Sequence, residues 1–154
     1  MALIELSELK AALRPGQRLL GLDLGEKTIG LALSDTGLTI ATPLKTLARG
    51  KFKVDAPVLI ALALEHDIGG LVVGFPINMD GTEGPSAQSA RAFTRNFASV
   101  SDLPVILIDE RLSTAAVTRT LIDADTSRRR RAELVDKMAA AYILQGALDR
   151  IRRF

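Results

Sequence analysis

Two short apolar segments, GGLVVGFP at residues 69–76 and LPVILIDE at residues 103–110, flank a segment with helical periodicity. Apolar runs of this length, separated by a helix, are typical of buried parallel strands in one sheet. Three further strands are predicted upstream, at residues 18–25, 28–35 and 38–47. Tight turns make them an antiparallel meander, and Pro43 favours an edge position for the third. The chain is therefore predicted to be an α/β domain built on a mixed sheet.

Helices are predicted at residues 4–13, 54–68, 85–99, 113–124 and 132–151. The length of 154 residues suits one domain, so we expect a single domain over residues 1–154, with residues 1–16 as an N-terminal helical extension. The chain has no cysteine, which excludes disulfides, thiolate metal sites and a cysteine nucleophile. We find no signal peptide or membrane span in the sequence and expect a cytoplasmic protein that does not bind membranes.

Acidic side chains stand where apolar ones are expected. Asp23 lies inside the apolar run LLGLDLG, and a buried carboxylate normally has a cationic partner or a metal. Asp109 and Glu110 end the strand VILIDE, at the edge where α/β sheets bind ligands. Asp136 begins a helical stripe that continues with Ala139, Ala140, Ile143 and Ala147. The small alanines let that helix approach the sheet closely.

Carboxylates from two strands and one helix are thus expected to converge. Oxygen ligands of this kind suit hard divalent cations such as Mg²⁺. A structural ion pair between Asp23 and Lys27 or an arginine is the alternative. Since neighbouring side chains on a strand alternate, Asp109 is expected to face away from Glu110 and to have a supporting or structural role.

Basic residues are concentrated near the C-terminus. Residues 1–110 hold 10 Lys and Arg against 13 Asp and Glu, whereas residues 111–154 hold 10 against 5. Four consecutive arginines precede or begin the last helix: Arg128, Arg129, Arg130 and Arg131. Cations there oppose the helix dipole, so a polyanionic partner is a better explanation than helix stability. A solvated charged surface is the structural alternative. Aromatic residues are only 4% of the chain, which favours recognition of a nucleic-acid backbone over base stacking.

The segments LLGLDLGEKTIGLALSD, VVGFPINMDGTEG, IDERLST and DKMAAAYIL, in this order, resemble the YqgF family of pre-16S rRNA nucleases, homologues of RuvC-like Holliday junction resolvases. The resemblance covers about residues 17–150. It implies a ribonuclease H-like fold, with a five-stranded mixed sheet and flanking helices, and a metal-dependent phosphodiesterase that matures the 5′ end of 16S rRNA. Its acidic positions fall on Asp23, Glu110 and Asp136, which are expected to bind Mg²⁺ or Mn²⁺ in a two-metal site.

Further residues are predicted to contact the substrate: Lys27, Asn78, Arg111 and Arg128 to Arg131. For Asn78 a purely structural role in its loop is equally compatible with the sequence. For Arg111 an effect on the neighbouring acids is as compatible as a phosphate contact. Three other functions remain open from the residues: a Holliday junction resolvase acting on branched DNA, which would act as a homodimer, a non-catalytic RNA-binding factor in ribosome assembly, and an ATP-binding module. The last would need two such domains around its nucleotide. The sequence does not distinguish a monomer from a homodimer.

Overall fold

The computed structural model describes residues 5–78, 80–109 and 128–153, and it describes side chains in the last of these ranges from Met138 onward. The described residues form four helices and five strands. In chain order these are α1 (Leu6–Ala12), β1 (Arg18–Leu24), β2 (Thr28–Ser34), β3 (Ala41–Ala48), α2 (Phe52–Glu65), β4 (Ile68–Phe75), α3 (Pro85–Ala98), β5 (Val105–Asp109) and α5 (Arg128–Ile151).

The five strands form one mixed sheet in the order β3-β2-β1-β4-β5. The meander β1-β2-β3 is antiparallel, and β4 and β5 continue the sheet parallel to β1. The predicted mixed sheet and the edge position of β3, which contains Pro43, are both confirmed. The carboxyl ends of β1, β4 and β5 consequently meet at one edge, which we call the carboxyl edge.

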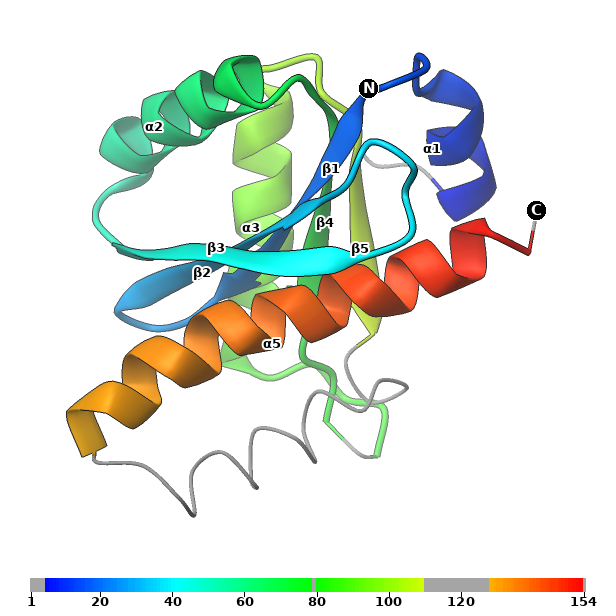
Figure 1. Ribbon diagram of the computed structural model, residues 1–154. Helices are drawn as coiled ribbons and strands as arrows, with labels where there is room; N and C mark the ends of the chain where they lie inside the picture. The colour runs from blue at the N-terminus through cyan, green and yellow to red at the C-terminus, as the bar shows by residue number, and fades with distance from the viewer. Residues whose placement is uncertain (1–4, 79, 110–127, 154) are drawn as a thin grey trace.

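Helices cover both faces of the sheet (Figure 1). On one face, α2 and α3 bury a core around Leu20, Leu22 and Phe97. On the other face, α5 and α1 bury a second core around Leu19 and Leu144. The side chains of β1 therefore alternate between two buried environments, which explains why its sequence is almost continuously apolar.

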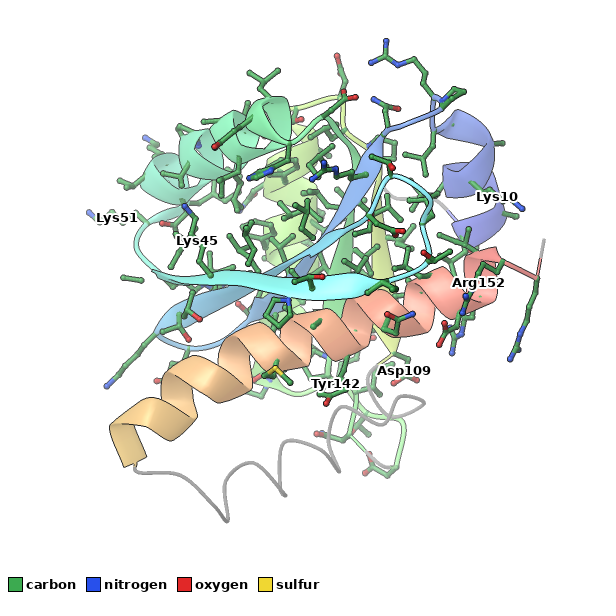
Figure 2. All side chains as sticks on the ribbon, viewed as in Figure 1. Lys10, Lys45, Lys51, Asp109, Tyr142 and Arg152 are labelled. Atoms are coloured by element: carbon green, nitrogen blue, oxygen red, sulfur yellow. The ribbon has the colours of Figure 1, made fainter. Side chains whose placement is uncertain are left out.

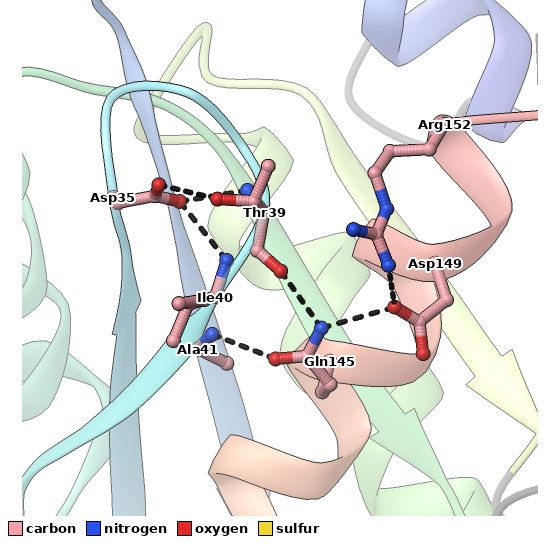
Figure 3. A network of polar contacts seen from close by, with 7 residues as sticks. All are labelled: Asp35, Thr39, Ile40, Ala41, Gln145, Asp149 and Arg152. Atoms are coloured by element: carbon pink, nitrogen blue, oxygen red, sulfur yellow. Dashed lines mark hydrogen bonds and ion pairs between the residues drawn. The ribbon is translucent and has the colours of Figure 1, made fainter.

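A polar network ties α5 to the loop between β2 and β3 (Figure 3). Gln145 Nε2 donates to the Thr39 carbonyl at 2.9 Å, and Gln145 Oε1 accepts from the Ala41 N–H at 2.9 Å. Within the loop, the Asp35 carboxylate accepts from the Thr39 hydroxyl at 2.6 Å and from the backbone N–H groups of Thr39 and Ile40. The network fixes the position of α5 relative to the meander.

Candidate active site

Asp23 lies near the carboxyl end of β1, on the face of the sheet that α5 covers. Leu20 and Leu22 belong to the core under α2 and α3, whereas Leu19 belongs to the core under α5, so alternation gives Asp23 the face of Leu19. Asp23 is only 8% exposed. Its neighbour on β2 is Gly30, which adds no side chain beside the carboxylate. The position combines burial with a glycine on the adjoining strand.

Helix α5 lies against β1 two residues before Asp23. A Cβ atom at Gly21 would stand 2.8 Å from Leu144 Cβ and 3.0 Å from the Ala140 carbonyl oxygen. The C-terminal end of α5 lies beside α1 (Figure 1), so α5 runs roughly opposite to β1. Asp136 precedes Ala140 by one helical turn, which puts its backbone about 6 Å further along α5, in the direction of the carboxyl edge.

The apolar stripe predicted for this helix is confirmed. Ala139, Ala140, Ile143 and Ala147 are all buried against the sheet. The Asp136 side chain itself lies outside the described residues. Its predicted approach to Asp23 therefore rests on the helix backbone and on this stripe.

At the end of β5, Asp109 pairs with Phe75 of β4. Ile106 and Ile108 belong to the core under α5, and Leu107 packs against the opposite core. Asp109 therefore shares the face of Leu107 and not the face of Asp23. Figure 2 labels it at the end of the strand. This agrees with the prediction that Asp109 does not point into the acidic site. Glu110, Arg111 and the predicted helix at residues 113–124 lie outside the described residues.

The predicted cationic contacts fall at two places. Lys27 is exposed in the turn between β1 and β2, where its carbonyl accepts a hydrogen bond from the Arg49 N–H at 2.8 Å. All four arginines of the run Arg128 to Arg131 belong to the first turns of α5, so the helix begins four residues earlier than expected. Their side chains lie outside the described residues.

Asn78 has a structural contact in the loop between β4 and α3. Its Nδ2 donates to Thr82 Oγ1 at 3.0 Å, and its backbone N–H donates to the Thr82 carbonyl at 2.9 Å. Asp80 Oδ1 accepts from the Thr82 hydroxyl at 2.6 Å. These bonds support the loop role that the sequence left open for Asn78.

The same loop is fastened to α3 by an ion pair. Arg91 Nε and Nη2 donate to the two Glu83 carboxylate oxygens at 2.7 and 3.1 Å. The hydrogen bond from Arg91 lowers the pKa of Glu83 below its usual value. The Arg91 guanidinium also lies 4.5 Å above the centre of the Phe75 ring, at the end of β4. The loop is thus held at the carboxyl edge by contacts at both of its ends.

No sequence motif singles out Arg49, whose guanidinium joins three parts of the carboxyl edge. One nitrogen donates to the Gly25 carbonyl at 2.7 Å and another donates to Ser89 Oγ at 2.8 Å. Arg49 also lines a cleft of about 520 Å³. The available signal was the segment KTLARGKFK at residues 45–53, which has four cations and no acid.

The chain's only histidine takes no part in this edge. His66 is the C-cap residue of α2 and stands just before β4, at the opposite end of that strand. Among the side chains that the structure describes, no group of three acidic, histidine or cysteine residues is close enough to hold a metal ion. Of the three predicted acids, only Asp23 belongs to that set.

The donor set of the predicted site suits a divalent cation. Asp23, Glu110 and Asp136 offer carboxylate oxygens, which hard cations such as Mg²⁺ and Mn²⁺ prefer. Asp23 itself stands on the central strand β1, opposite Gly30 of β2. No helix in the described part of the chain has the length and apolar character to cross a membrane.

Comparison with known proteins agrees with this architecture. A relative from Paramagnetospirillum magneticum is 60% identical over 97% of this chain and 96% of its own length, and one from Methylocella silvestris is 59% identical over 98% and 94%. Both carry the description "Putative pre-16S rRNA nuclease".

Among solved structures, Thermus thermophilus RuvC in complex with a Holliday junction substrate matches with a TM-score of 0.55 and 13% identity, over 88% of this chain and 96% of that one. This likeness confirms the predicted ribonuclease H-like fold. The family model described as "RuvX: Holliday junction resolvase" matches residues 17–150. The four sequence motifs predict this same family under the name YqgF. Together with the close relatives, the match means that the chain belongs to the RuvX family.

Proposed function

We propose that this protein is a metal-dependent nuclease that hydrolyses phosphodiester bonds in the precursor of 16S rRNA. The family membership and the description of relatives at about 60% identity support a nuclease of this class. The single observation that carries the proposal is the buried Asp23 on the α5 face of the sheet, beside Gly30. A buried carboxylate on the central strand is of the residue type that binds hard divalent cations.

In the proposed site Asp23, Glu110 and Asp136 hold Mg²⁺ or Mn²⁺ together. Glu110 immediately follows the end of β5, and the backbone of Asp136 lies one turn beyond the close contact between α5 and Gly21. When bound, a pair of such cations activates the attacking water and stabilises the leaving oxygen. The carboxylates serve to position these ions, and no histidine is required for proton transfer.

The remaining residues would bind the phosphate backbone. Lys27 lies in the turn that follows β1, and the run Arg128 to Arg131 begins the helix that carries Asp136. Cations on both sides of the acidic site would hold a polyanionic strand across it. Arg111, next to Glu110 in the sequence, would contribute in the same way.

A second candidate is cleavage of branched DNA, which the family description and the fold likeness to RuvC favour. A junction resolvase acts as a dimer with two sites, because both strands must be cut symmetrically. The RNA substrate is preferred here because the relatives at about 60% identity are described by it.

The test is cleavage of a labelled 16S rRNA precursor and of a four-way DNA junction, in Mg²⁺, in Mn²⁺ and in EDTA. We expect metal-dependent cleavage of the RNA by the native chain and at least a hundredfold loss in Asp23→Asn. Asp67→Asn is the matched control, since Asp67 is exposed at the opposite edge of the sheet and its φ of 53° is one that asparagine tolerates.

Cleavage of the junction alone would favour the resolvase. Binding of RNA without cleavage in either metal, equally by the native chain and Asp23→Asn, would instead favour the assembly factor.

A further inference from the structure

A cleft opens at the carboxyl edge on the side of the sheet that carries α3, across from the acidic site. It has a volume of about 520 Å³ and is lined by Leu24, Gly25, Glu26, Arg49, Pro85, Ser86 and Ser89. These residues come from the end of β1 and the turn after it, the segment after β3 and the first turns of α3. The volume is in the range of small-ligand pockets and is large enough for one nucleotide of a strand.

Arg49 is the cation of this cleft, and its position is fixed. Its guanidinium donates to the Gly25 carbonyl and to Ser89 Oγ, which uses two of its five N–H groups. Its own backbone N–H donates to the Lys27 carbonyl. The side chain is therefore held between the β1–β2 turn and α3 before any ligand arrives, which lowers the entropy cost of binding an anion.

The other groups around the cleft also suit an anion, with one exception. Helix α3 has 14 residues and no side-chain cap, and it has no acid in its first turn. Ser86 and Ser89 add hydroxyl groups from the same helix. Glu26 is the exception, because its exposed carboxylate lines the cleft and would repel an anion.

The cleft is close to the proposed acidic site along the chain. Gly25 lines the cleft and follows Asp23 by two residues, and two residues of extended chain span at most about 7 Å. Asp23 faces α5 and the cleft faces α3, so a strand that reaches both must pass around the end of β1. A phosphate in the cleft and one at the acidic site would then be near neighbours along the strand.

We propose that this cleft binds a backbone phosphate of the RNA strand, one or two nucleotides from the phosphate held at the acidic site, with Arg49 as its main contact. The inference rests on the proposed function, since it concerns the same substrate. It assigns to Arg49 the role of a positioning residue, which holds the strand in register while the acidic site acts on the neighbouring linkage.

The test measures binding of a fluorescent 12-nucleotide single-stranded RNA by anisotropy, in EDTA and at several salt concentrations. Arg49→Gln removes the charge and keeps a shorter, neutral N–H donor at this position. We expect about three- to tenfold weaker binding and a salt slope reduced by about one. Arg95→Gln is the matched control, because Arg95 is exposed in the last turn of α3, about 13 Å from Ser86 along the helix. It should change the affinity less than twofold.

A second variant does not depend on Arg49 remaining in place. Glu26→Gln removes the opposing carboxylate from the exposed turn and should strengthen RNA binding by about two- to threefold. Equal losses in Arg49→Gln and Arg95→Gln, or unchanged or weaker binding in Glu26→Gln, would overturn the proposal. Competition by a free mononucleotide as strong as that by the 12-nucleotide RNA would also overturn it, since the cleft would then be a nucleotide site.

The result of this RNA-binding test is independent of the result of the cleavage test. The binding assay contains no metal and requires no cleavage, so the cleft can bind RNA as proposed even if the chain cuts neither substrate. Conversely, metal-dependent cleavage that is lost in Asp23→Asn would stand if Arg49→Gln bound RNA like the native chain.

Discussion

Gly21 and Leu144 approach so closely that no side chain fits between them: a Cβ atom at Gly21 would lie 2.8 Å from Leu144 Cβ. The neighbouring Ala140 carbonyl would lie 3.0 Å away, and neither atom is the flexible end of a side chain. A glycine in β1 thus sets the distance between the strand that carries Asp23 and the helix that carries Asp136.

Gly21→Ala is therefore expected to push α5 away from β1. Overpacking of this kind lowers the free energy of unfolding by about 1–3 kcal/mol. RNA cleavage should fall as well, because the acidic residues of the site are divided between the two elements. Urea unfolding and the cleavage rate at saturating metal measure the two effects.

Gly146→Ala, which lies on α5 itself, is the matched control. A Cβ atom at Gly146 meets no atom within 4 Å, and alanine is the better helix former by up to about 1 kcal/mol. Stabilisation by Gly146→Ala together with destabilisation by Gly21→Ala would support the packing argument. Equal stability of the two variants would contradict it.

The contact of Gln145 with the β2–β3 loop predicts a second effect on α5. Gln145→Met keeps the shape of the side chain but loses the bonds to the Thr39 carbonyl and the Ala41 N–H, as well as an exposed bond to the Asp149 carboxylate. We expect the free energy of unfolding to fall by about 1–3 kcal/mol, since each bond contributes roughly 0.5–1.5 kcal/mol. Gln88→Met, at an exposed position of α3, should leave stability nearly unchanged. A similar loss in both variants would show that the network is not the cause.

Asp35 makes the stability of this loop dependent on acid. Hydrogen bonds from the Thr39 hydroxyl and from the backbone N–H groups of Ile40 and Thr39 lower its pKa from 3.8 to about 2. A carboxyl group whose pKa is lower in the folded state stabilises that state above about pH 4, and the contribution disappears as the pH falls toward 2.

We therefore expect native protein and Asp35→Asn to differ in melting temperature at pH 7 and to converge near pH 2. Thr39→Val removes the largest cause of the shift, so it should raise the pKa of Asp35 in an NMR titration. A difference in melting temperature that stayed constant from pH 7 to pH 2 would contradict this assignment.

The sequence predicted the sheet well because its strands carry local signals. Pro43 indicated an edge strand, and β3 is at the edge. The alanine stripe after Asp136 indicated a close helix, and Ala140 packs directly over Gly21. Helix α2, however, begins at Phe52, two residues earlier than predicted. Its first residue contacts Phe93 with ring centres 5.5 Å apart, a long-range contact that helical periodicity does not reveal.

The candidate site was predictable only in part, because it too depends on contacts between residues far apart in the sequence. Asp23 stood out because a charge interrupts an apolar strand. Arg49 did not, because its partners Gly25 and Ser89 are 24 and 40 residues away in the sequence. Only the folded chain brings the three together, and a cation between a turn and a distant helix has no periodicity of its own.

The edge strand β3 also limits how two copies of this chain can associate. Pro43 lacks a backbone N–H, the pairing register shifts nearby between Leu31 and Ala32, and Lys45 is exposed. Each of these features discourages a foreign strand from extending a sheet. A pair of molecules is thus not expected to form by continuous β-pairing along β3, and any dimer that uses this side would have to join through side chains.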